Sequence, residues 1–142
     1  MSVMKRRGVA AIGLAAITLL VVLVFGVVKW NEQEALDDGI VAVKNGDYGK
    51  AVQLLTPLSD AGNPVARDTM GIMYAYGWGV ERNRSRAAEL MRNAKVADLG
   101  DRFYSIGKKL ENSDHTEAIE WYRLAAEEGH AQAKARIAKP SS

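Results

Sequence analysis

The chain opens with one long apolar stretch and continues as a series of shorter amphipathic ones. Residues 8–28 contain no charged side chain over 21 positions, with Lys5, Arg6 and Arg7 just before them and Lys29 just after. A helix of this length rises about 31 Å, close to the roughly 30 Å hydrocarbon core of a bilayer. The basic residues ahead of it predict a cytoplasmic N-terminus, with everything downstream across the membrane.

The apolar stretch therefore divides the chain. We expect a cytoplasmic tail at 1–7, a transmembrane signal-anchor helix at 8–28 and a juxtamembrane linker at 29–34, in a single-pass protein of a bacterial inner membrane with its C-terminal domain in the periplasm. A cleaved secretory signal is the alternative. Such signals have apolar regions of about 7–15 residues and end in a small-x-small site, whereas this stretch is longer and residues 25–30 lack Ala-x-Ala.

Beyond the apolar stretch the hydrophobic positions recur with helical spacing, and alternating runs typical of strands are missing. Glycine, asparagine and proline break the pattern at regular intervals. Asp47 or Asn45, Asn83 and Asp114 are suited to cap helix starts, and Pro64 suits a first helical position. The pattern predicts helices over about 32–44, 47–61, 64–76, 84–97, 100–111, 114–128 and 130–138.

These helices repeat in pairs. The second helix of each pair carries an alanine shortly after its start, at Ala51, Ala87 and Ala118, which are 36 and 31 residues apart. A period in this range is typical of stacked helix pairs, each of which buries its apolar face against the next. A small residue lets the two helices of a pair approach closely, while Leu55, Met91 and Tyr122 would fill the space beside it.

The repeats resemble a known family. Residues 70–80 read Met-Gly-Ile-Met-Tyr-Ala-Tyr-Gly-Trp-Gly-Val, and Arg86-Ala87 follows. This is similar to the Sel1-like repeat, a relative of the tetratricopeptide repeat, and residues 120–130 resemble its second helix. The resemblance implies an all-α fold, a short α-solenoid of two to three helix pairs over 35–138, with a tail at 139–142. The last pair departs from the pattern, because its loop is 5 residues shorter and lacks Gly-x-Gly-Val.

Charge and composition narrow the function. The net charge is +2 over 142 residues, but three basic residues precede the apolar stretch, which leaves 16 basic against 17 acidic residues after it. A near-neutral domain has no general attraction for nucleic acid. Cysteine is absent, which excludes disulfides and thiolate metal sites. With only His115 and His130 and no catalytic or phosphate-binding motif, we predict no enzyme, metal or cofactor.

The loop after residue 76 carries the first candidate contacts. Trp78 stands between two glycines at a variable position of the repeat, and Tyr76 is close by. Exposed aromatic side chains are common anchors of protein interfaces. The alternative is that Trp78 folds back over the short loop near Asn112. Arg82 and Arg84 follow and could meet an acidic partner or lipid head groups, or could form a solvated helix start.

Alignment with the tetratricopeptide pattern implies which first-helix residues face the binding groove. Its candidate protein-binding residues are Asp68, Ile72, Asp101, Tyr104 and Lys108. A lining of mixed charge and apolar character suits a protein or peptide ligand.

The resemblance implies a protein-protein interaction module anchored in the inner membrane through residues 8–28. In its sharper form, this is an immunity protein that binds and inhibits a secreted antibacterial effector of the lipase type. The alternative is a structural scaffold or adaptor for envelope or cell-wall machinery. The sequence does not name the partner, and association of two copies is left open.

Overall fold

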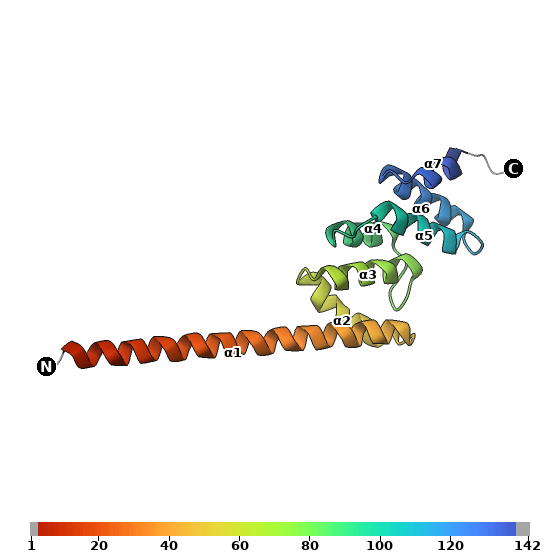
Figure 1. Ribbon diagram of the computed structural model, residues 1–142. Coiled ribbons are helices and arrows are strands. Elements are labelled where there is room, and N and C mark those ends of the chain that lie inside the picture. Colours follow the sequence, from red (N-terminus) through yellow and green to blue (C-terminus); the bar gives the residue numbers. More distant parts are fainter. Residues whose placement is uncertain (1–2, 139–142) are drawn as a thin grey trace.

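The computed structural model describes the backbone of residues 3–138 and the side chains of residues 17–138. Over that backbone the chain forms seven helices and no strand (Figure 1). The helices are α1 (Val3–Lys44), α2 (Tyr48–Asp60), α3 (Pro64–Tyr76), α4 (Arg84–Asn93), α5 (Leu99–Leu110), α6 (His115–Glu127) and α7 (Ala131–Ala138).

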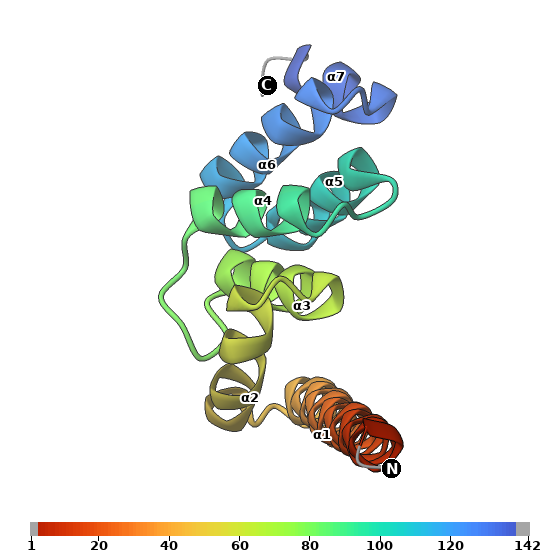
Figure 2. The ribbon, with the colours of Figure 1, turned by 90° about the vertical axis from the view of Figure 1, so that its left-hand side faces the viewer.

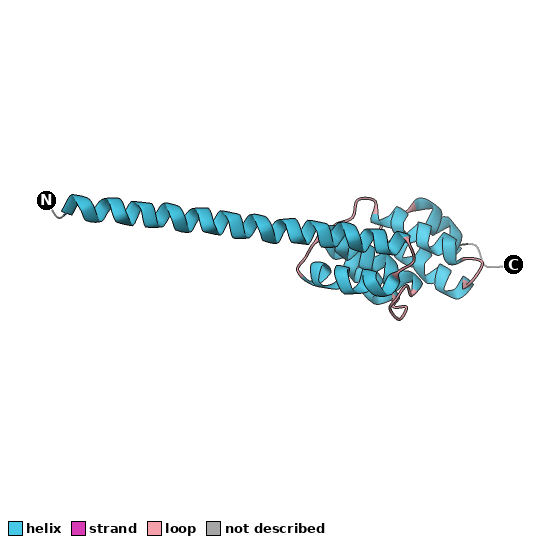
Figure 3. Cartoon of the chain, turned by 90° about the horizontal axis from the view of Figure 1, so that it is seen from below, coloured by secondary structure: helices cyan, strands magenta, loops and turns pink. Residues whose placement is uncertain are grey.

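Helix α1 is a single element of 42 residues, and its N-terminal half projects away from the rest of the chain (Figures 1 and 3). Residues 29–34, predicted as a linker, are part of this helix, because nothing in Lys29–Glu34 interrupts a helical backbone. The apolar side chains from Ile17 to Val28 are exposed, Leu20 by 63%.

Part of the predicted membrane segment falls outside the described side chains. The side chains of the predicted tail 1–7 and of residues 8–16 are not among those described. The predicted C-terminal tail 139–142 lies outside the described residues altogether. Within the described part of the chain, no helix is both long and apolar enough to cross a bilayer.

Three helix starts carry the predicted caps, at Asp47, Asn83 and Asp114, and a fourth carries a cap at Asn63 that was not predicted. The side chains of Asp47, Asn63, Asn83 and Asp114 each accept a hydrogen bond from a first-turn amide, and Pro64 occupies a first helical position. These acceptors satisfy backbone N–H groups that have no partner within the helix. The caps therefore fix where α2, α3, α4 and α6 begin.

The turn between α4 and α5 differs from the prediction. Helix α4 ends at Asn93, four residues before the predicted end, and Lys95 and Asp98 take left-handed backbone angles (φ 53° and 54°). Gly100, predicted to begin a helix over 100–111, lies in the first turn of α5. A Cβ there would come within 3.2 Å of the His130 Cβ, so this glycine allows close packing and does not end a helix.

The helices stack as the pairs α1–α2, α3–α4 and α5–α6, followed by α7 (Figure 2). The two helices of each pair touch at a glycine of the first helix, which in the second and third pairs lies beside the fully buried alanine of the second helix. The glycine and the side chain against it are Gly39 and Leu55 in the first pair, Gly71 and Met91 in the second, and Gly107 and Tyr122 in the third. The predicted filling residues Leu55, Met91 and Tyr122 are confirmed, but the small residue that each one packs against is a glycine of the first helix, which the prediction did not name.

Two hydrophobic clusters run through the stack. One joins α1, α2, α3 and α4 around Leu55 and Met73, and the other joins α3 to α7 around Phe103, Trp121 and Tyr122. Helix α4 contributes to both, through Leu90 to the first cluster and Met91 to the second. The side chains named here are almost completely buried, so the clusters hold the repeats in one fixed relation.

Candidate functional site

Side chains on the first helices of the second and third pairs, and in the turn before α7, contact one another, and we call this group the first-helix face. It comprises Asp68, Ile72 and Tyr76 of α3, Asp101, Tyr104 and Lys108 of α5, and His130 before α7. Polar contacts connect these helices. Asp68 Oδ2 lies 3.1 Å from an Arg102 guanidinium nitrogen, and Asp101 Oδ1 lies 3.2 Å from His130 Nε2.

Asp68 occupies an unusual position for a carboxylate. Its side chain is half-buried, and its Oδ1 has no hydrogen-bond partner among the described residues. Burial raises the pKa of Asp68, while the positive charge of Arg102 opposes the rise. The pair therefore joins α3 to α5 without fully compensating the desolvation of the carboxylate.

His130 fixes the junction of α5 and α7. Its Nδ1 accepts a hydrogen bond from the Ala133 backbone N–H at 3.1 Å, so its proton is on Nε2, facing Asp101. The ring stacks on Tyr104 with 4.2 Å between centroids. Asp101, Tyr104 and His130 line a shallow depression together with Gly129 and the first two residues of α7. The sequence prediction named the first two and missed the positioning role of His130.

A second ring contact lies deeper on the same side. Tyr122 is fully buried against Gly107, with Tyr104 at 5.3 Å and the Arg136 guanidinium 5.8 Å from its ring centre. Burial, followed by the negative charge of Glu111, raises the pKa of Tyr122 to about 12. Its hydroxyl is therefore neutral at any physiological pH.

Trp78 is less exposed than the sequence predicted. It is half-buried between Tyr48 and Tyr76, at centroid distances of 5.2 and 4.9 Å, so it packs against the start of α2. Gly79 makes this possible. It has φ 70°, and a Cβ there would come within 2.8 Å of the Tyr48 carbonyl oxygen. The 77–83 loop therefore lies directly on the start of α2.

The aromatic group extends onto the first-helix face. Lys109 Nζ of α5 lies 5.7 Å from the centre of the Tyr76 ring, and burial raises the pKa of the Tyr76 phenol. Sequence reasoning missed Tyr48 and Lys109. They come from other repeats, and no local motif marks them as neighbours of Trp78.

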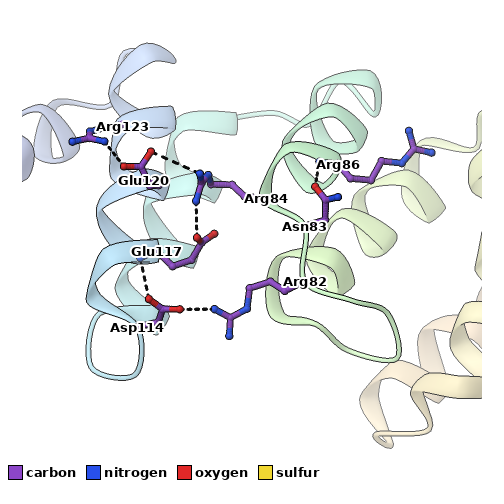
Figure 4. Close-up of polar contacts among 8 residues, drawn as sticks. All are labelled: Arg82, Asn83, Arg84, Arg86, Asp114, Glu117, Glu120 and Arg123. Carbon is purple, nitrogen blue, oxygen red and sulfur yellow. Dashed lines mark hydrogen bonds and ion pairs between the residues drawn. The ribbon is translucent and has the colours of Figure 1, made fainter.

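The predicted arginines are paired within the chain (Figure 4). Arg82 contacts Asp114 at 2.8 Å, and Arg84 contacts Glu117 at 2.5 Å and Glu120 at 3.8 Å. These contacts join the start of α4 to α6. They account for the arginine cluster without a partner, so a partner-binding role for Arg82 and Arg84 stays a prediction.

The remaining predicted residues fall into two groups. Asp101 and Lys108 are exposed, whereas Ile72 and Tyr104 are half-buried and pack on the second hydrophobic cluster. Side-chain contacts thus link α3 to α5, whereas Arg82 and Arg84 pair with residues at the start of α6. Among residues with described side chains, no group of three or more potential metal ligands occurs.

The helix pairs, their glycines and their capped second helices coincide with a known repeat. The sequence pattern of the Sel1 repeat family matches residues 34–63, 70–95 and 96–130, together more than half of the chain. The chain belongs to the Sel1 repeat family. Each matched segment corresponds to one helix pair, with the first Sel1 repeat beginning inside α1.

One similar solved structure is a Sel1 repeat protein from Oxalobacter formigenes. It is 30% identical over 70% of this chain, with a TM-score of 0.41, and the chain spans 43% of that protein. A comparison with curated proteins gave no match. Sel1 repeats generally mediate protein-protein interaction and typically carry no catalytic site, which fits this framework of packing glycines and paired charges.

Proposed function

We propose that this Sel1 repeat protein captures another protein through its first-helix face while held at a bacterial inner membrane, with the repeats in the periplasm. The observation that carries the proposal is the chemistry of that face. Asp101 is 75% exposed in its side chain, Lys108 is exposed, and the half-buried ring of Tyr104 lies between them. Side chains of both charges beside an aromatic ring, on a rigid frame, suit a polypeptide surface.

The rigidity of the frame strengthens this proposal. Tyr76 is held by Trp78 and Lys109, and Tyr104 by His130, so the aromatic side chains are ordered before any partner arrives. Ordered side chains lose little conformational entropy on binding.

The membrane part of the proposal is supported by the uncharged stretch 8–28 with its basic N-terminal flank. It is also supported by the exposed apolar side chains of residues 17–28 and by Trp30, which is 74% exposed just after them. Tryptophan is enriched at the membrane-water boundary. In this proposal 1–7 is the cytoplasmic tail, 8–28 spans the bilayer and 35–138 forms the repeat domain.

Site-specific photo-crosslinking in living cells tests the binding face. A crosslinking amino acid at Lys108 should trap a partner, whereas one at Glu89, which is exposed on α4, serves as the matched control. Trapping at Lys108 alone supports the proposal. Equal trapping at both sites, or trapping at Glu89 alone, contradicts it.

The sharper form of the proposal is an immunity protein that neutralises a secreted lipase-type effector, and the alternative is a scaffold for envelope machinery. Immunity predicts that deletion harms cells only when the toxin is present. A scaffold predicts an envelope defect from the deletion alone.

A reporter fused after Ser142 tests the localisation. We expect activity from a reporter that works only in the periplasm. Activity from a reporter that works only in the cytoplasm would reverse the topology and exclude an action on a periplasmic effector.

A further inference from the structure

An apolar depression lies where α2 runs back along α1. Its lining combines Val28 and Ala35 of α1 with Leu54, Pro57 and Leu58 of α2, and the polar side chains at its edge are Asn31, Glu32 and Gln53. Glu32 is paired with Lys29 at 3.0 Å. The surface is therefore mainly apolar and carries no uncompensated charge.

Its position along α1 links it to the apolar half of the helix. Val28 is both the last residue of the exposed apolar stretch and part of the depression. Because α1 continues unbroken through residues 29–34, no flexible joint separates the two. The second half of α2 therefore stays beside the end of the apolar stretch.

Helix geometry then gives the depth of the depression in a bilayer. Val28 and Ala35 are separated by about 10 Å along the axis. Each headgroup layer of a bilayer is about 5–8 Å thick, outside the hydrocarbon core. If the core ends at Val28, the depression begins at the boundary of the hydrocarbon core and extends through the headgroup layer, because its lining on α1 runs from Val28 to Ala35.

We propose that the α1–α2 depression is a phospholipid-contact surface, covered by the upper acyl chain of a lipid in the same bilayer that holds α1. The inference rests on the proposed membrane anchoring. Apolar side chains at the boundary between headgroups and acyl chains gain free energy by leaving water. Such a contact on α2 would hold the first repeat, and the stack built on it, at one height and tilt above the membrane.

The absence of cysteine from the sequence allows a direct test with single labels. Pro57→Cys places a label in the depression, Val27→Cys in the apolar stretch and Lys44→Cys at the far end of α1, about 24 Å beyond Val28. All three sites are exposed. Each full-length variant is labelled with a small fluorophore and reconstituted in phosphatidylcholine-phosphatidylglycerol vesicles with and without lipid carrying a nitroxide near the top of the acyl chain. Circular dichroism checks the fold, and Gln53→Cys replaces Pro57→Cys if the latter fails to fold.

We expect loss of fluorescence at the Val27 and Pro57 sites and unchanged fluorescence at Lys44. If the label at Val27 is quenched but the labels at Pro57 and Gln53 are as bright as the one at Lys44, the lipid contact is overturned while the membrane anchor stands. No quenching at Val27 overturns the anchor itself, and the lipid contact with it. Equal quenching at all three sites also overturns the inference, because the whole domain would then lie against the bilayer.

Discussion

Replacing Gly107 with alanine tests how the helix pairs are held together. A Cβ at this position would lie 2.7 Å from Tyr122 Cε1 and 3.1 Å from the Ala118 carbonyl oxygen. The backbone oxygen belongs to α6. The Tyr122 ring is confined by Tyr104 and Arg136, so neither neighbour can move aside without shifting a helix.

The expected cost follows from two opposing effects. Alanine in place of a helical glycine gains about 1 kcal/mol from backbone entropy, while forcing a methyl group into a filled core costs about 1–3 kcal/mol or more. With a rigid ring and a backbone oxygen as neighbours, we place the cost at the upper end. The net loss is about 2 kcal/mol, which lowers the melting temperature by roughly 10 °C in a domain of this size.

Two comparison variants at other glycines test the same argument. In Gly71→Ala the new methyl meets a backbone oxygen at the same 3.1 Å, that of Ala87, but the side chain against it is the flexible Met91 at 2.8 Å, so we expect a smaller loss than in Gly107→Ala. In Gly49→Ala nothing lies within 4 Å, and we expect a gain of about 0.5 kcal/mol. Urea and thermal unfolding followed by far-ultraviolet circular dichroism give the ranking. A Gly107→Ala protein as stable as its Gly49→Ala counterpart would refute the close-packing argument.

Three further predictions follow from single contacts. Trp78→Ala should lower the free energy of unfolding by about 2 kcal/mol in urea titrations, because it removes two ring contacts, while Trp78→Phe should retain much of that stability. The backbone hydrogen bond from Glu117 and the charge of Arg82 lower the pKa of Asp114 in the folded protein. Its contribution to the free energy of unfolding is therefore complete at a pH above the pKa of Asp114 in the unfolded chain, and is lost as the pH falls through its lower pKa in the folded protein. Asp114→Ala should therefore lower the melting temperature by a few degrees at neutral pH and not in strong acid, and Asp114→Asn, which keeps a cap, should lower it less. Burial raises the pKa of Asp68 in the folded protein. The stability of the fold therefore decreases as the pH rises from the pKa of Asp68 in the unfolded chain to its higher pKa in the folded protein. The free energy of unfolding of Asp68→Asn at neutral pH should lie within about 1 kcal/mol of the parent value. Its melting temperature, measured as a function of pH, should lack the decrease that the parent shows in mildly acidic solution.

Much of the fold could be predicted from the sequence because its signals are local. The caps Asp47, Asn63, Asn83 and Asp114 satisfy backbone groups within their own first turns, so they mark helix starts without reference to the rest of the chain. The regularly spaced alanines Ala51, Ala87 and Ala118 likewise mark a helix contact that recurs in all three pairs. This regularity is why helix pairing could be read before the structure was known.

The candidate site depended far more on the tertiary structure. The sequence predicts a free basic cluster at Arg82 and Arg84. In the structure their acidic partners lie at the start of α6, more than 30 residues further along the chain. Trp78 looked exposed until Tyr48 of the preceding repeat was found beneath it.

Composition and periodicity determined that this protein is a stack of helix pairs following a long apolar helix, because hydrophobic spacing and capping act over one or two turns. Only the tertiary structure decided which charges and rings remain available on the first-helix face. Pairing across repeats depends on how the helices stack, and a change of a few residues in one loop alters which side chains meet.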